Sequence, residues 1–161
     1  MKFVGRLLMN NVIKLNEDIT TLGREDFQRL ENVASAHPSN RARFCLHHSD
    51  NDLVQQMIIC LAKDSYVRPH RHINKAESFH IIKGEILVVV FNEDGSITKK
   101  IIMSASDELS CKVYRLAPGL WHTVIPLSSA AIFHEVTSGP FLKEESEFSK
   151  WSPEINDFEA I

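Results

Sequence analysis

From Arg41 onward, the sequence breaks into short apolar runs separated by turns rich in Gly, Pro, Asn, Asp and Ser. Runs of this length, bounded by turn residues at regular spacing, are typical of strands in a sandwich or barrel. The runs that we expect to be strands are 43–47, 53–61, 66–72, 78–82, 85–91, 97–103, 112–116, 123–126 and 130–136. Roughly eight short strands after one helix predict an all-β sandwich or barrel closed on itself, with room for a small ligand at its mouth.

The part of the chain before this region carries one clear helical pattern. Phe27, Leu30 and Val33 recur at the spacing of one helix face, with acidic residues in the first turn and a His-Pro pair after the last. We therefore expect one amphipathic helix over residues 24–34. Residues 1–14 are mildly apolar and would add an edge strand or reach across to a partner subunit.

The length of 161 residues suits one domain with a sizeable core. We divide it into an N-terminal extension that contains the helix (1–40), a barrel (41–140) and a C-terminal tail (141–161). The tail is acidic but has aromatic residues at Phe141, Phe148, Trp151 and Phe158. We expect these side chains to pack the tail back onto the barrel.

Composition excludes several functions. The net charge is −3 and there is no basic block, which does not favour a nucleic-acid surface. No apolar run approaches the ~20 residues of a membrane helix, and the N-terminus is not a convincing signal peptide. The three cysteines are odd in number and far apart, so we expect free thiols and a cytoplasmic location.

The residues that carry chemistry begin at His70 and His72. Because they are two residues apart, both imidazoles project from one face of an extended chain, and Glu77 follows after a short connection. Two imidazoles and a carboxylate form part of a coordination sphere for a divalent first-row metal. The alternative is two histidines, out of eight in the chain, that fall close together on a surface strand. Further along, a Pro-Gly turn delivers His122 at the start of a strand.

These residues resemble the two motifs of the cupin superfamily. His70-x-His72-x4-Glu77-x6-Gly84 is similar to the first motif, and Pro118-Gly119-x2-His122 is similar to the core of the second. The resemblance implies a double-stranded β-helix, or jelly-roll barrel. It also implies that His70, His72, Glu77 and His122 bind one metal ion.

A narrower resemblance covers residues 38–153 and points to the WbuC family of cupin metalloproteins. It rests on Tyr66-Val67-Arg68-Pro69-His70-Arg71-His72, Lys75-x-Glu77, Gly119-x-Trp121-His122, Glu135-Val136 and Gly139-Pro140-Phe141. That family is associated with gene clusters for surface polysaccharides. The resemblance therefore implies a role in polysaccharide biosynthesis, with a sugar or sugar nucleotide as the ligand, but no particular reaction.

Strand alternation suggests further pocket residues. Tyr66 and Arg68 share a face with the two histidines, so we expect Arg68 close to the metal, where it would bind a substrate carboxylate or phosphate. Its alternative role is an ion pair with Glu77 or Glu135. Glu135 shares a face with Phe133 and would be a general base or the partner of a nearby cation.

Two more candidates flank the ligands. Lys75 would orient Glu77 or bind an anion, and Trp121 would form a stacking wall for a sugar ring or a part of the core. His80 falls on the face opposite Glu77, which favours a packing role over that of a fifth ligand.

The ligand set does not select one metal, since iron, manganese, nickel and zinc all tolerate it. We expect an enzyme that acts on a small polar, carbohydrate or anionic substrate. The alternatives are a non-catalytic module that binds or senses a ligand and a purely structural metal, which is disfavoured because structural sites are usually closed. A homodimer is the expected assembly.

Overall fold

The computed structural model describes residues 10–154. Within that range it has one α-helix, α1 (Arg24–Ala36), one 3-10 turn, η1 (Lys143–Glu145), and eleven strands. The strands are β1 (Val12–Lys14), β2 (Arg41–Cys45), β3 (Val54–Ala62), β4 (His70–His72), β5 (Glu77–Lys83), β6 (Glu85–Phe91), β7 (Ile97–Ser104), β8 (Val113–Leu116), β9 (Trp121–Pro126), β10 (Ala130–Ser138) and β11 (Ser146–Phe148).

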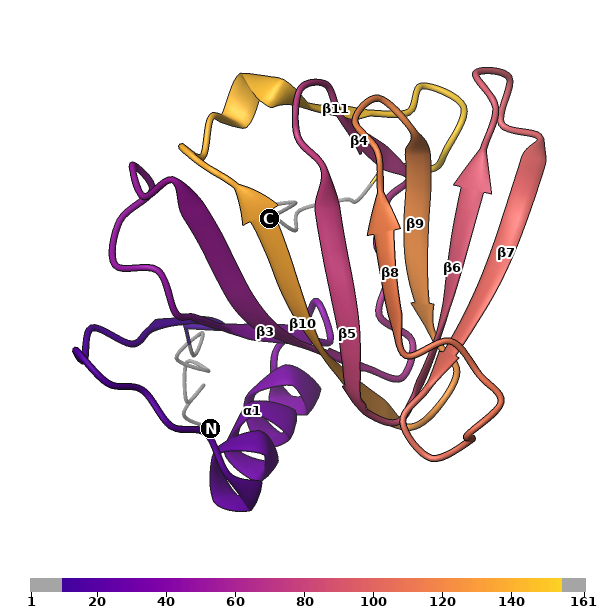
Figure 1. The fold of residues 1–161 in the computed structure, drawn as a ribbon. Helices are drawn as coiled ribbons and strands as arrows, with labels where there is room; N and C mark the ends of the chain where they lie inside the picture. The colour runs from indigo at the N-terminus through magenta and orange to yellow at the C-terminus, as the bar shows by residue number, and fades with distance from the viewer. Residues whose placement is uncertain (1–9, 155–161) are drawn as a thin grey trace, which may run out of the picture.

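The strands form two sheets that face each other (Figure 1). One sheet has the order β1-β2-β3-β10-β5-β8 and the other β11-β4-β9-β6-β7, and every pair except the parallel pair β1–β2 is antiparallel. Side chains that alternate inward from both sheets, such as Phe79, Val88, Val124 and Phe133, pack as one apolar core. The predicted all-β architecture with one N-terminal helix is confirmed.

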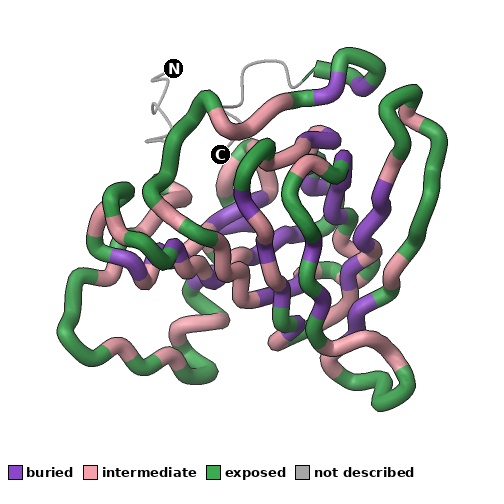
Figure 2. Tube along the Cα trace, turned by 45° about the horizontal axis from the view of Figure 1, so that its top comes forward, coloured by how far each residue is buried: buried purple, intermediate pink, exposed green. Residues whose placement is uncertain are grey.

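The helix covers the outer face of the larger sheet. The Asp26 carboxylate accepts a hydrogen bond from the Gly23 N–H at 2.8 Å, which gives this backbone N–H at the start of the helix a partner. Leu30 and Ala34 are fully buried against a second apolar cluster that includes Phe44 and Ile132. Figure 2 shows buried residues along the strands, while the connecting loops are largely exposed.

The predicted boundaries hold within a few residues, with one informative exception. The strand expected over residues 66–72 begins only at His70, because Pro69 lacks the N–H that a continuing strand would need. Val12–Lys14 forms the edge strand expected near the N-terminus, while residues 1–9 and Phe158 lie outside the described range. No helix within residues 10–154 has the length and apolar character to cross a membrane.

Residues 146–148 of the tail pair with the barrel as a strand that the apolar pattern did not reveal. We call residues 139–154 the C-terminal strap. Its strand β11 pairs antiparallel with β4 at the edge of the smaller sheet (Figure 1). Further along the strap, Trp151 packs on Phe91, with ring centroids 5.0 Å apart. The strap therefore runs along the strand that carries the first two candidate ligands.

Candidate metal centre

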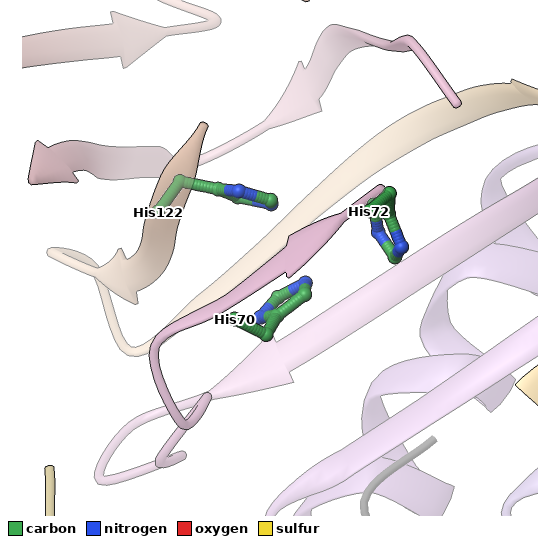
Figure 3. Close-up of side chains that lie close together, drawn as sticks. All are labelled: His70, His72 and His122. Atoms are coloured by element: carbon green, nitrogen blue, oxygen red, sulfur yellow. The ribbon is translucent and has the colours of Figure 1, made fainter. Parts of the chain in front are cut away.

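Three histidines converge at one end of the barrel. His70 and His72 come from β4 and His122 from the adjacent strand β9, where it stands opposite His70 in the register. Figure 3 shows the three rings directed into the same space. One nitrogen from each ring lies within 4.8 Å of the other two.

The turn before β9 brings the two ligand segments together. Gly119 has a φ of 81°, a left-handed conformation that residues with a Cβ rarely adopt. Its N–H donates to the backbone oxygen of His72 at 2.7 Å. The Pro-Gly turn therefore reverses the chain beside β4 and sets His122 at the start of β9.

Hydrogen bonds to the other ring nitrogens fix the orientation of each imidazole. The Nδ1 atom of His70 lies 2.9 Å from the Arg68 carbonyl, and that of His122 lies 3.0 Å from the Leu120 carbonyl. Because a carbonyl only accepts, both Nδ1 atoms carry a proton, so Nε2 is the atom of each ring that is placed to bind a metal ion. The Nδ1 atom of His72 lies 3.0 Å from the Ser146 hydroxyl, in the C-terminal strap.

The Glu77 carboxylate contacts two of the three imidazoles. Its Oε1 lies 3.0 Å from Nε2 of His122, and its Oε2 lies 3.4 Å from Nε2 of His72. The Tyr114 hydroxyl donates to Oε1 at 2.7 Å. Burial acts to raise the pKa of Glu77, but His122 and the other two histidines outweigh it and hold the pKa well below its usual range. Glu77 is therefore ionised, as a metal ligand must be.

The histidines respond to burial and to this charge in different ways. Burial, together with the neighbouring imidazoles, lowers the pKa of His70 to about 3. Burial also acts to lower the pKa of His122, but the Glu77 charge outweighs it and the pKa of His122 is raised. His70 is therefore uncharged at neutral pH, whereas the raised pKa of His122 reflects its attraction to the Glu77 carboxylate.

These residues fit a metal ion. The buried Nε2 atom of His122 has no hydrogen-bond partner of good geometry among residues 10–154, although Glu77 is near it. A buried polar atom without a hydrogen-bond partner is costly unless something binds it. Three imidazoles with oriented second nitrogens and one carboxylate form the kind of donor set that divalent first-row metals take.

Glu135 lies on the inward face of the larger sheet, in register with the core residue Phe79. Its strand register places it opposite Phe79 of β5, two residues along from Glu77. Burial, followed by the charge of Glu77, raises the pKa of Glu135 to about 8. The side chain therefore carries a proton at neutral pH.

The structure gives Arg68 and Tyr66 partners in the C-terminal strap. The Arg68 guanidinium donates to the Ser149 carbonyl at 2.8 Å and to the Ser152 hydroxyl at 3.3 Å. The Tyr66 hydroxyl donates to the Pro153 carbonyl at 3.0 Å. Neither of the acidic partners expected for Arg68 takes its hydrogen bonds, and the substrate roles of both residues stay predictions.

Lys75 also binds the strap. Its ammonium group lies 3.0 Å from the Glu145 carboxylate and donates to the Pro140 carbonyl, and the residue is 8% exposed. Lys75 therefore holds the strap through these contacts and does not take the expected role of orienting Glu77. Its predicted role in anion binding would require this ion pair to open.

Trp121 lies on the outer face of β9, since its neighbour His122 points inward. Its indole N–H donates to the Glu93 carboxylate at 3.0 Å, and the Arg71 guanidinium stacks over its ring at 4.4 Å. Trp121 and Arg71 line an open groove of about 470 Å³, and Trp151 also lines it. The sugar-stacking role of Trp121 stays a prediction, and the groove is where this indole would meet a ligand.

Two contacts of the site were absent from the sequence-based prediction. Tyr114 could have been found, because it alternates inward with Leu116 on β8, toward the strand that carries Glu77. Ser146 had no comparable signal, because its place beside His72 depends on how a three-residue strand far along the chain pairs with β4.

Similar folds occur among solved structures. Protein SO0799 from Shewanella oneidensis is 10% identical, with a TM-score of 0.57 over 70% of this chain and 75% of that chain. An oxalate oxidase in complex with the substrate analogue glycolate is 15% identical, with a TM-score of 0.51 over 71% of this chain and 57% of that chain. At these identities the comparisons show the fold alone, which is that of a cupin.

Oxalate decarboxylase from Bacillus subtilis gives a TM-score of 0.49 at 20% identity, over 61% of this chain and 24% of that chain. The chain thus spans about a quarter of that protein's length. The family model described as "Domain of unknown function (DUF6016)" matches residues 22–103, just over half of the chain, and the chain belongs to that family. No curated protein matches it. The narrower resemblance to the WbuC family stays a prediction.

Proposed function

We propose that the protein is a mononuclear metal-binding cupin in which His70, His72, His122 and Glu77 hold one divalent transition-metal ion, either Fe, Mn, Ni or Zn. The observation that supports this most is the convergence of three ring nitrogens whose imidazoles are each hydrogen-bonded through the other nitrogen. This outer hydrogen bond is what metal-ligating histidines almost always make. Glu77 adds a negative charge to the same place.

We further propose that the site acts on a small polar substrate at the barrel mouth. A bound ion supplies Lewis acidity and lowers the pKa of a coordinated water. Glu135 is the proton-transfer residue of this proposal, because its raised pKa of about 8 suits it to give or take a proton near neutral pH. A sugar or sugar nucleotide of surface-polysaccharide synthesis is the substrate class that the WbuC resemblance favours. A homodimeric assembly and a cytoplasmic location are also predictions.

The metal is tested by elemental analysis of protein purified without a metal-affinity tag. We expect about one transition-metal ion per chain in the wild type and its loss in His70→Ala and His122→Ala. His80→Ala is the matched control, since His80 is exposed on the opposite face of β5 and should leave the metal content unchanged. Metal content that did not fall in the two ligand variants would refute the site.

Turnover is tested separately on the metal-loaded protein. The probes are sugars, sugar nucleotides, keto acids, oxalate and glycolate, with and without dioxygen, and products are followed by mass spectrometry. A substrate that is converted by the wild type, and bound but not converted by Glu135→Gln at full metal content, supports an enzyme. A probe that binds in a metal-dependent way and is recovered unchanged would support the alternative, a non-catalytic binding or sensing module.

A further inference from the structure

The three histidines differ in what holds the ring nitrogen that faces away from the site. His70 and His122 each donate from Nδ1 to a carbonyl two residues earlier in their own chain segment. His72 instead contacts the side chain of Ser146, which lies 74 residues further along the chain. His72 is also the most accessible ligand, with 21% of its side chain exposed. Its orientation therefore depends on a contact from outside the barrel.

The pairing of β11 with β4 produces this contact. In the antiparallel register Ser146 stands opposite His72, Glu147 opposite Arg71 and Phe148 opposite His70. Side chains of directly opposed residues share a face of the sheet. Ser146 and Phe148 therefore lie beside the two ligands, and the ring of Phe148 is 6.2 Å from that of His70. Glu147 points to the other face, where its carboxylate accepts from Arg71 at 2.7 Å.

Residues on both sides of the ligand pair hold this register. Before His70, the Pro69 carbonyl accepts from the Ser149 N–H at 2.9 Å, and Arg68 donates to the Ser149 carbonyl. After His72, the Ile73 N–H donates to the Glu145 carbonyl at 2.9 Å. The ion pair of Lys75 with Glu145 adds a second contact at this end of β11. The first motif and the strap are thus joined at each end of β11, which makes a one-residue slip of Ser146 costly.

We propose that the C-terminal strap is a structural part of the metal centre, with Ser146 as the positioning residue for His72. This inference rests on the proposed function, since it concerns how one ligand of that site is oriented. A hydroxyl both donates and accepts, so the Ser146 oxygen is able to accept from Nδ1–H and leave the Nε2 lone pair for the ion. Within residues 10–154, the Ser146 hydroxyl is the only hydrogen-bond partner of the His72 Nδ1 atom, so its loss removes the contact that favours the ligating tautomer.

The loss of such an outer contact typically costs 10–100-fold in metal affinity. The change that isolates the hydroxyl is the pair Ser146→Thr and Ser146→Val, because the two side chains have nearly the same shape and both suit a strand. Ser146→Ala is a second test of the same oxygen without added bulk. Glu147→Gln is the control on the same strand, since it weakens a strap contact on the face away from the ligands.

The experiment measures Zn²⁺ affinity of the full chain by competition with a chromophoric chelator, with thermal unfolding of each metal-free variant in parallel. We expect Ser146→Val and Ser146→Ala to bind Zn²⁺ about 10–100-fold more weakly than the wild type. Ser146→Thr should lie within a few-fold of the wild type, and so should Glu147→Gln. The midpoint of unfolding should be nearly the same for Thr and Val at position 146.

The outcomes separate this inference from the proposed function. If the wild type binds Zn²⁺, His122→Ala does not, and Ser146→Val binds as tightly as Ser146→Thr, the role of Ser146 is wrong and the metal site stands. If the wild type fails to bind Zn²⁺, or His122→Ala binds it equally well, the metal site is wrong and the strap has no ligand to position. If Ser146→Val and Glu147→Gln weaken binding equally, docking of the strap matters and the hydroxyl does not, which also overturns the role of Ser146.

Discussion

His70 and His122 are oriented by their own chain segments, whereas His72 is oriented by a strap that arrives 74 residues later. A carbonyl two residues away is already in place when the strand forms. A hydroxyl on a distant strand is in place only after a long loop has closed and the strap has docked. The first motif thus contains His70, whose ring is oriented by a carbonyl two residues away, and His72, whose ring is oriented by a residue far along the chain. The second is where we expect the metal centre to respond to changes elsewhere in the molecule.

The largest effect should come from comparing His122→Ala with His72→Ala in metal-free protein. His122 is 1% exposed and faces the buried Glu77 carboxylate at 3.0 Å, so its removal leaves that charge without its nearest cationic partner. We expect a loss of about 3 kcal/mol in the free energy of unfolding. His72 is partly exposed and lies farther from the carboxylate, at 3.4 Å, so its loss should be about 1 kcal/mol or less.

Urea denaturation in the presence of a chelator measures both values. The wild type and His80→Ala, which changes an exposed histidine on the outer face of the larger sheet, set the reference. Equal losses for His72→Ala and His122→Ala would contradict the distinction between a buried, locally held ligand and an accessible one.

Lys75→Met should have the next largest effect on stability. It should weaken metal binding only by disturbing the orientation of His72. The substitution keeps the volume of the stem but leaves the Glu145 carboxylate without its ion pair. We expect about 2 kcal/mol of lost stability, because the pair is largely buried, and a fall of about tenfold in Zn²⁺ affinity. Lys99→Met, on the exposed side of β7, is the matched control and should change neither quantity.

Combining Lys75→Met with Ser146→Val sharpens the comparison. If Lys75 acts on the metal only by docking the strap, the two losses of affinity should be less than additive, because both act through the same imidazole. Fully additive losses would mean that Lys75 affects the ligands by a route other than the strap.

Tyr114→Phe tests a contact made entirely inside the barrel. The phenol donates to Glu77 at 2.7 Å, and burial together with the Glu77 charge raises the pKa of Tyr114, so the hydroxyl stays protonated. Removal of this donor should cost about 1–2 kcal/mol in the free energy of unfolding and weaken Zn²⁺ binding by up to about tenfold. Its effect should add to that of Ser146→Val, since the two residues act on different ligands. Denaturation and chelator competition check both expectations.

The same division between local and tertiary contacts explains what could be predicted from the sequence. The period of two along a strand was enough to place His70 with His72, and Phe79 with Glu77, on the inward face. That His122 joins them was implied by the resemblance to the cupin motifs. The face that each of these side chains takes depends on its neighbours along the strand, whereas the meeting of His70 with His122 depends on the pairing of β4 with β9. The face that each side chain takes along a strand was therefore predictable.

The partners of Arg68 and Lys75 were not predictable in this way. Alternation gave the side from which each cation leaves the chain, but their partners lie in the strap. The strand β11 has only three residues, Ser146–Phe148, and no alternating apolar pattern that would announce it. Its pairing with β4 follows from ion pairs and backbone hydrogen bonds whose partners are more than 70 residues apart, and single-chain patterns do not encode such matches.

The smallest effect should come from Glu93→Gln. Glu93 lies in the turn between β6 and β7, and its side chain contacts Arg71 and Trp121 on the outer face of the ligand-bearing strands. The Glu93 carboxylate, 76% exposed, pairs with Arg71 at 2.7 Å and accepts from the Trp121 indole at 3.0 Å, while His72 and His122 lie on the inner face. Because exposed ion pairs contribute little and are screened by salt, Tm should fall by no more than about 2 °C at low ionic strength and by less in 1 M salt. Zn²⁺ affinity should stay at the wild-type value. A drop in affinity comparable to that of Ser146→Val would mean that the two faces of β4 are coupled, and that local hydrogen bonds alone do not hold His70 and His122.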